Sequence, residues 1–282
     1  MSISFSVTAY NEYDPTRARG ERLMRALSSA RAHPDLDEIL VVDDGSDDFA
    51  WLTERMIGCA DVKLYHNETN LGVFLNKIES VAQATSDWVI LCDSDNHKDL
   101  VHIGKVLSLP LDPNTWYCPS FAKPAFNYRC YIGEYDLQSI SRFDEGGFVQ
   151  RNVAKCCLNT GNQVVHRATF LSVFEKYRGT QYWLDLWELY KDFHGLHNIN
   201  VHERPKRYWR QVWDANDSLL LNSLWLYAGK KLSVVDGLEY EHHMAQGKDS
   251  DASNYNRSPP EKGPLNEQLL QHLIECAEAA KQ

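Results

Sequence analysis

Two aspartates directly follow a run of apolar residues in the first half of the chain. The run 88–92 (Trp-Val-Ile-Leu-Cys) has the composition of a buried strand, and Asp93, Ser94, Asp95 and Asn96 come next. Residues i and i+2 of an extended segment project to the same side, so Asp93 and Asp95 are expected to converge on one point. Two carboxylates at one point repel each other unless a divalent cation or its phosphate-bearing ligand lies between them. The pair therefore predicts a metal-assisted site for a phosphorylated ligand; the alternative is a pair of solvated loop residues or helix caps.

Three further polar segments lie where other strands end or a helix begins. A strand predicted over 3–9 runs into the segment 8–12, Asp43-Asp44-Gly45-Ser46 follows one over 38–42, and Asn70-Leu71-Gly72 begins a helix. Ligands of open α/β sheets bind outside the carboxyl ends of the strands. The four segments are therefore expected to meet at one edge of a sheet.

The elements that would position these segments alternate along the first hundred residues. Apolar runs predict strands, helical spacing of apolar residues predicts helices between them, and this alternation favours βαβ units in a doubly wound, mostly parallel sheet. Beyond residue 109 the pattern is looser, with strand-like runs at 116–121 and 162–166, a helix over 182–193, a polar loop over 247–264 and a final helix over 265–279. The predicted strands of the first half are 3–9, 38–42, 62–65 and 88–92, and the predicted helices are 17–32, 49–57 and 70–84.

Composition limits the class of protein. The chain has 282 residues and a formal net charge of −10, which disfavours nucleic-acid binding because that function needs a basic surface. No stretch approaches the roughly 20 apolar residues of a membrane span, and residues 1–9 do not have the pattern of a signal peptide. The seven cysteines are scattered, and Cys156 and Cys157 are adjacent, so reduced thiols and a cytoplasmic location are expected.

The four segments, in this order, resemble the family 2 glycosyltransferases, which have the GT-A (Rossmann-like) α/β fold. The resemblance covers about the first hundred residues. It implies transfer of a sugar from a nucleoside-diphosphate donor, a UDP-sugar, to a hydroxyl of a glycan or other acceptor, with inversion and with Mn²⁺ or Mg²⁺ as cofactor. It also implies a nucleotide-sugar-binding half over 1–109 and an acceptor-binding half over 110–246. The rest, 247–282, is expected to be a loop, mobile because of its polar composition, and a helix.

The resemblance assigns the donor site residue by residue. It gives Tyr10 a contact with the nucleobase, makes Asp44 the acceptor for a base N–H, and places Lys77 where a cation offsets the diphosphate charge. The alternatives are a packing role for Tyr10, helix capping for Asp43 and Asp44, and solvent exposure for Lys77. The implied donor-binding residues are Thr8, Ala9, Tyr10, Glu12, Asp44, Asn70, Gly72, Lys77, Asp93, Ser94 and Asp95.

The resemblance also implies a metal site of the Asp-x-Asp (DXD) kind. Asp95 is expected to bind the metal directly, and Asp93 to contact the ribose, or the metal through water. One more ligand is expected from a late histidine, for which His243 is preferred over His242; either could instead be a structural histidine. The segment 241–257, with Lys248 and Arg257, is expected either to close over the donor as a lid or to be a surface linker.

An inverting enzyme needs a general base for the acceptor hydroxyl. The family carries a Glu-Asp pair where this chain has Tyr182-Trp183, so Asp185 becomes the first candidate and Glu188 the second, with Asp144 or Glu145 as further candidates. Because that pair is missing, a catalytically inactive GT-A domain that binds a nucleotide sugar or a glycan stays an alternative. A haloacid-dehalogenase-type phosphatase also uses Asp-x-Asp, but there the motif ends the first strand of the core.

Overall fold

The computed structural model describes residues 1–10, 18–124, 126–139, 162–182, 184 and 217–242, and most positions of 271–279. The chain divides into two compact units. The first unit comprises Met1–Gly133, Gly161–Leu171 and Leu232–His243, and the second comprises Glu134–Thr160, Ser172–Lys231 and Met244–Gln282.

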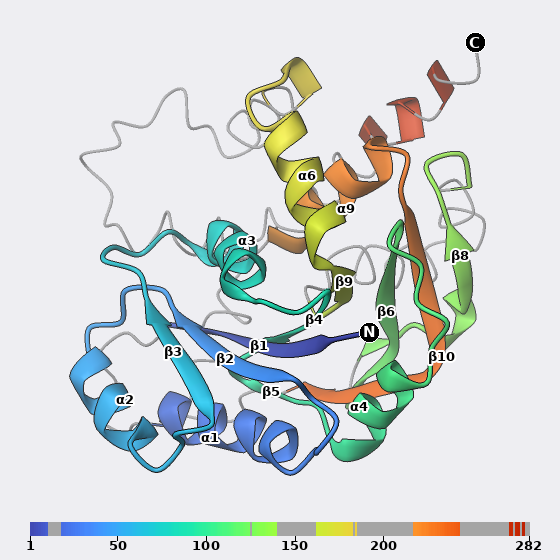
Figure 1. Cartoon of the computed structure of the whole chain (residues 1–282). Coiled ribbons are helices and arrows are strands. Elements are labelled where there is room, and N and C mark those ends of the chain that lie inside the picture. Colours follow the sequence, from blue (N-terminus) through green and yellow to red (C-terminus); the bar gives the residue numbers. More distant parts are fainter. Residues whose placement is uncertain are drawn as a thin grey trace. The chain divides into compact units, whose positions relative to one another are not determined.

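A parallel set of strands forms one half of the sheet in the first unit (Figure 1). β1 lies between β2 and β4 and runs parallel to both, and β3 pairs with β2 in the same direction. All four strands were predicted, because each is a short apolar run followed by polar residues. Their bounds are Ile3–Ala9 (β1), Glu38–Asp43 (β2), Val62–His66 (β3) and Trp88–Asp93 (β4).

The other half of the sheet contains antiparallel pairs. The strand order is β3-β2-β1-β4-β9-β6-β10-β5, in which β9 runs antiparallel to both β4 and β6, and β5 antiparallel to β10. β10 was not expected from the sequence, because Asp236-Gly237 in its middle has the composition of a turn. The bounds are Asn96–His97 (β5), Thr115–Lys123 (β6), Phe126–Asn127 (β7, paired with β6), Gly133–Tyr135 (β8), Val164–His166 (β9) and Lys231–His242 (β10).

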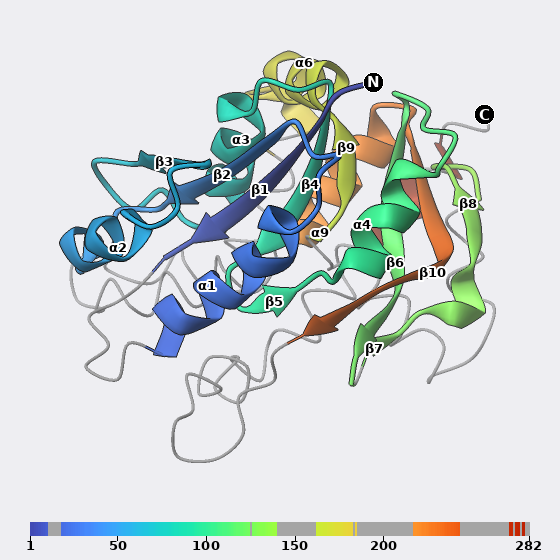
Figure 2. The ribbon, with the colours of Figure 1, turned by 60° about the horizontal axis from the view of Figure 1, so that its bottom comes forward.

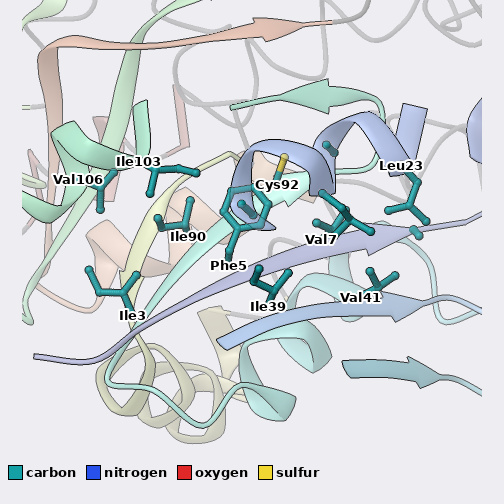
Figure 3. Packing of buried hydrophobic residues seen from close by; sticks show 14 of the residues in the cluster. Ile3, Phe5, Val7, Leu23, Ile39, Val41, Ile90, Cys92, Ile103 and Val106 are labelled. Atoms are coloured by element: carbon teal, nitrogen blue, oxygen red, sulfur yellow. The ribbon is translucent and has the colours of Figure 1, made fainter. Parts of the chain in front are cut away.

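Helices cover both faces of this sheet, as a doubly wound fold requires. α1 and α4 lie on one face (Figure 2), and the apolar side chains of that face form the core shown in Figure 3. Alternate residues of β1, namely Ile3, Phe5 and Val7, enter this core, so the residues between them face α3 on the other side. The helices are α1 (Ala18–Arg31), α2 (Phe49–Met56), α3 (Val73–Gln83) and α4 (Leu100–Leu107).

The second unit contains α9 (Asp217–Tyr227) and the later part of α6 (Arg167–Tyr177). The rings of Tyr182 and Tyr227 stack with their centroids 3.6 Å apart, and the indole N–H of Trp225 donates to the carbonyl of Lys231 at 2.8 Å. Of the helix predicted over 182–193, the described positions Tyr182 and Leu184 are helical. The described positions of the predicted final helix are helical too.

In the described part of the chain, no helix is both long enough and apolar enough to cross a membrane.

Candidate functional site

The ends of three parallel strands lie side by side at one edge of the sheet. In the strand register Thr8 is the partner of Asp93, and Ala9 is the partner of Asp43. Backbone hydrogen bonds continue past the strand ends: Asp44 N donates to Ala9 O at 2.8 Å, and Ser94 N donates to Thr8 O at 3.0 Å. The structure thus brings together three of the four segments that the sequence selected.

Asp93 is held by four side chains. Its Oδ1 accepts from Lys77 Nζ and Thr8 Oγ1, each at 3.2 Å. Its Oδ2 accepts from Asn162 Nδ2 at 2.8 Å and from Asn96 Nδ2 at 3.3 Å. The side chain is 29% exposed, so part of this fixed carboxylate faces solvent.

The charge on Asp93 is stabilised by these donors. Burial raises the pKa of the carboxyl, but the Lys77 ammonium and the hydrogen bonds from Asn162 and Thr8 outweigh burial, and the pKa lies below its ordinary value. Asp93 is therefore an anion at neutral pH.

Lys77 is buried rather than exposed, so the alternative of a solvated helical lysine is wrong. Its side chain is 3% exposed and lies on the face of α3 that packs on the sheet. Ser6 of β1 contacts Ser80 of α3 on this face. Ile90 and Cys92 of β4 enter the core on the opposite face, so Asp93 points towards α3. Because Lys77 belongs to α3 and its ammonium contacts Asp93, the fourth segment, at the start of α3, lies at the same edge of the sheet.

The strand alternation that was expected to align Asp93 with Asp95 ends at Asp93. Ser94 and Asp95 form a turn between β4 and β5, because the chain leaves the parallel half of the sheet here. Asp95 is half-buried at this turn. Its position relative to Asp93 thus follows from the turn and not from the period of an extended strand.

Asp44 and Asp43 do not cap α2, which was one of the expected alternatives. Asp44 accepts from the backbone amides of Leu71 and Gly72 at 2.8 and 2.9 Å, and it also accepts from the side chain of Asn67 at 3.1 Å. Burial raises the pKa of Asp44 although these hydrogen bonds oppose the rise. Asp44 therefore joins the end of β2 to the loop that begins α3.

Asp43 closes the turn itself. It is fully buried and accepts from the backbone amide of Ser46 at 3.0 Å and from the Ser46 hydroxyl, and it lies 2.8 Å from His66 Nδ1. Gly45 of this turn has φ of +71°, and a Cβ there would lie 2.8 Å from the backbone nitrogen of Asn70. Only a glycine allows the turn to pack this closely on the loop 67–72.

The remaining expected donor residues are placed as follows. Thr8 uses its hydroxyl on Asp93, Ala9 is buried, and Tyr10 is half-buried directly after β1. Gly72 has φ of +85° and occupies the N-cap position of α3, one residue after the exposed Leu71. Asn70 acts within its own loop, where its Oδ1 accepts from Gly72 N at 3.1 Å.

His242 is linked to Asp93 through a third residue. Its Nδ1 lies 2.8 Å from Asn96 Oδ1, and Asn96 in turn donates to Asp93. His242 therefore orients Asn96 in this arrangement. Among the described residues, no group of three or more His, Cys, Asp or Glu side chains could hold a metal ion.

Comparisons with known proteins bear on the first part of the chain. Residues 4–116 match the sequence model of the family described as Glycosyl transferase family 2. The resemblance to the family 2 glycosyltransferases is confirmed. None of the curated proteins compared matches the chain. The match and the fold support glycosyl transfer as the reaction class.

Solved glycosyltransferase structures share the fold. S. aureus TarS 1–349 in complex with UDP-GlcNAc matches with a TM-score of 0.53 and 14% identity over 98% of this chain and 72% of that chain. A longer S. aureus TarS chain gives 0.53 and 15%, over 97% of this chain and 43% of that one. The mannosyltransferase PcManGT from Pyrobaculum calidifontis, in complex with GDP-Man and Mn²⁺, gives 0.50 and 12%, over 99% and 73%. The predicted GT-A fold is confirmed.

The carboxylates of Asp93, at the end of β4, and Asp95, in the turn after it, are oxygen ligands of the kind that Mg²⁺ and Mn²⁺ prefer. Such ions are often held by one or two carboxylates, with substrate phosphates and water completing the shell. Asp93 and Asp95 suit that shared mode, although they cannot form a complete protein site. Several expected family 2 residues lie outside the described part of the chain: Glu12, Asp144, Glu145, Asp185, Glu188, His243, Lys248 and Arg257.

Asn162 was not expected as a site residue. It lies 69 residues beyond Asp93 in the chain and precedes β9. Because β9 pairs with β4, Asn162 lies beside Asp93 at the end of β4. The sequence places Asn162 at the start of a strand-like run, in a Gly-Asn segment that resembles the family's lead-in to its catalytic base. Neither feature predicts a contact with Asp93.

Proposed function

We propose that this protein is a glycosyltransferase that moves a sugar from a UDP-sugar to a hydroxyl of a glycan or other acceptor, with the help of Mn²⁺ or Mg²⁺. The observation that carries the proposal is the meeting of the Asp44 turn, Lys77 and the Asp93–Asp95 turn at one sheet edge, inside the segment that matches family 2. TarS, which shares the fold, has been crystallised with UDP-GlcNAc, and this supports the choice of UDP.

The nucleoside would bind between the end of β1 and the turn after β2. Tyr10 is half-buried there and can offer its ring to the base. Asp44 organises the loop 67–72 through two backbone amides and one side chain. We infer that it shapes the base pocket, and that any lone pair left by these donors accepts the imide N–H of uracil.

The diphosphate would lie beside Asp95 and Lys77. Asp95 would hold the metal ion directly, while Asp93, already fixed by four donors, would receive a ribose hydroxyl or a metal-bound water. A divalent ion bound there acts as a Lewis acid for the departing nucleoside diphosphate. Lys77 keeps Asp93 ionised and reduces the negative potential that a diphosphate would meet.

The acceptor side of the reaction rests on residues outside the described part. We propose Asp185 as the base that removes the acceptor proton, with Glu188 as the second candidate, and inversion at the anomeric carbon as the outcome. His243 is proposed as an additional metal ligand, with His242 oriented towards Asn96 instead.

Calorimetry with UDP tests the donor and the metal together. UDP should bind in the presence of Mn²⁺ and lose its affinity in excess EDTA or in Asp95→Ala. Asp35→Ala is a matched control, because Asp35 is an exposed aspartate in the loop before β2, at the opposite end of the strands. Equal UDP affinity with EDTA and with Mn²⁺ would refute the metal role.

Donor turnover separates the enzyme from an inactive binding domain. Slow hydrolysis of a UDP-sugar by the wild type, abolished in Asp95→Ala, would support a transferase. Binding without any turnover, in the presence of a range of acceptors, would support the inactive domain. Release of inorganic phosphate from a phosphomonoester would support the phosphatase alternative.

A further inference from the structure

Asn162 contacts Asp93 at both its backbone and its side chain. The Asn162 amide donates from Nδ2 to Asp93 Oδ2 at 2.8 Å, and its Oδ1 accepts from Asp93 N at 3.1 Å. Asn162 is 3% exposed, so these bonds are shielded from water. A planar amide that binds two points of one residue fixes both the rotamer of the carboxylate and the direction of the chain at the strand end.

A buried lysine, Lys98, contacts Asn162 in turn. Lys98 is fully buried, and its Nζ donates to the backbone carbonyl of Asn162 at 3.3 Å. The same ammonium lies 4.7 Å from the centre of the Tyr240 ring, and the Tyr240 hydroxyl is 3.5 Å from Asn162 Nδ2. Lys98 and Tyr240 therefore contact Asn162 from the backbone side and from the side-chain side.

His102 completes the contacts of Lys98. His102 Nδ1 lies 2.8 Å from the carbonyl of Glu239, which can only accept, so Nδ1 carries the proton and Nε2 accepts from Lys98 at 3.4 Å. His102 is buried, and its pKa lies well below the ordinary value because of burial and the nearby ammonium. The described residues place no carboxylate within ion-pair distance of Lys98.

A buried cation without a carboxylate partner is costly, and a well-packed apolar side chain of similar length would be at least as stable. Stability therefore does not explain why a lysine occupies position 98. Its ammonium contacts Asn162, and Asn162 binds Asp93 at the end of β4. We propose that Asn162 is a positioning residue that sets the orientation of Asp93, and that Lys98 holds Asn162 in that position. The proposal rests on the proposed function, in which Asp93 contacts the nucleotide donor.

Three variants test this positioning role. Asn162→Ala removes both contacts to Asp93, and Asn162→Asp keeps the size but places a carboxylate against Asp93 Oδ2. Lys98→Met removes the ammonium but keeps the length of the side chain. Ser4→Ala is the control: it removes a buried hydroxyl of the same sheet that donates to Glu38 at 2.6 Å, at the other end of β1.

The affinity for UDP in the presence of Mn²⁺ should fall about tenfold or more in both Asn162 variants and in Lys98→Met, the range seen when residues that orient metal ligands are removed. Asn162→Asp should bind no better than Asn162→Ala because of charge repulsion. Lys98→Met should keep the melting temperature of the wild type or exceed it. Normal affinity in the three variants, with melting temperatures lowered as in Ser4→Ala, would overturn the proposal.

A crystal structure of Asn162→Ala separates this proposal from the proposed function. The Asp93 carboxylate should adopt another rotamer once the amide is gone, whether or not UDP binds. An Asp93 that keeps its orientation would overturn the positioning role. A wild type that binds no nucleotide, together with a rotated Asp93 in the variant, would overturn the proposed function and leave the positioning role supported.

Discussion

Replacing the buried Lys98 by methionine should change how stability depends on pH. Lys98 has no exposed surface, and burial lowers its pKa from an ordinary value of 10.5 to about 8. Below about pH 8 the amine is charged in both the folded and the unfolded state, and the folded state carries the cost of burying the charge. As the pH rises, the folded amine loses its proton first, so that cost disappears.

The size of the effect follows from the shift. A lowering of this size corresponds to about 3 kcal/mol in the free energy of unfolding. The wild type should therefore gain stability relative to Lys98→Met as the pH rises from about 8 to about 10.5. By about pH 9.5 this gain should reach about 2 kcal/mol. The buried thiols Cys92 and Cys118, whose pKa values burial raises to about 12, occur in both proteins. Lys98 lowers both thiol pKa values, so its removal leaves the folded thiols protonated at about pH 9.5 as in the wild type, and their contribution cancels in the difference between the two proteins.

Urea unfolding of both proteins at about pH 7 and about pH 9.5 measures this difference. We expect the wild type to become more stable relative to Lys98→Met over that interval by about 2 kcal/mol. A difference between the two proteins that does not change with pH would show that Lys98 titrates in the folded state as it does in water. The reasoning from burial would then be refuted.

Three other substitutions have defined outcomes. Lys77→Met should lower the free energy of unfolding by about 1–3 kcal/mol. Because the pKa of Asp93 is lowered in the folded state, this loss should shrink below about pH 4, where the Asp93 carboxyl becomes protonated. Urea unfolding at two pH values measures the change. Asp44→Asn must turn its NH₂ group towards a backbone amide or towards Asn67, so stability should fall by about 1–3 kcal/mol; calorimetry with UDP then tests its role in base binding, and unchanged affinity would confine Asp44 to holding the loop. Gly45→Ala should cost at least about 2 kcal/mol because of its positive φ and the close backbone, whereas Gly58→Ala, which meets nothing within 4 Å, should unfold at nearly the wild-type urea concentration.

The sequence alone was enough to determine the parallel half of the fold. The strands β1 to β4 and the helices α1 to α3 were predicted within a few residues of their observed bounds. Each is a local pattern of apolar residues bounded by polar or turn-forming residues, and alternating strands and helices of this length are connected as βαβ units. The strand ends then had to lie at one edge, which is why the strand pattern was sufficient to select Thr8, Asp44 and Asp93 as neighbours.

Only the tertiary structure decided what these residues contact. Spacing left open an exposed Lys77 and a helix-capping Asp44, and it placed Asp95 in line with Asp93. In the structure Lys77 is buried against Asp93, Asp44 holds the loop before α3, and the strand ends before Asp95. Each outcome depends on packing between segments distant in sequence. The local pattern gives the period of a helix or strand, but it does not show which side chain fills a gap between two elements or where a strand leaves the sheet.

The clearest case is the pair Asn162 and Lys98. An asparagine before a strand and a lysine before a helix have no local pattern that predicts this contact, and 64 residues separate them. They meet because β9 inserts antiparallel beside β4, at the point where the sheet stops being parallel. A buried polar contact of this kind depends on the complete fold, since its hydrogen bonds gain strength only after packing has removed the water around them.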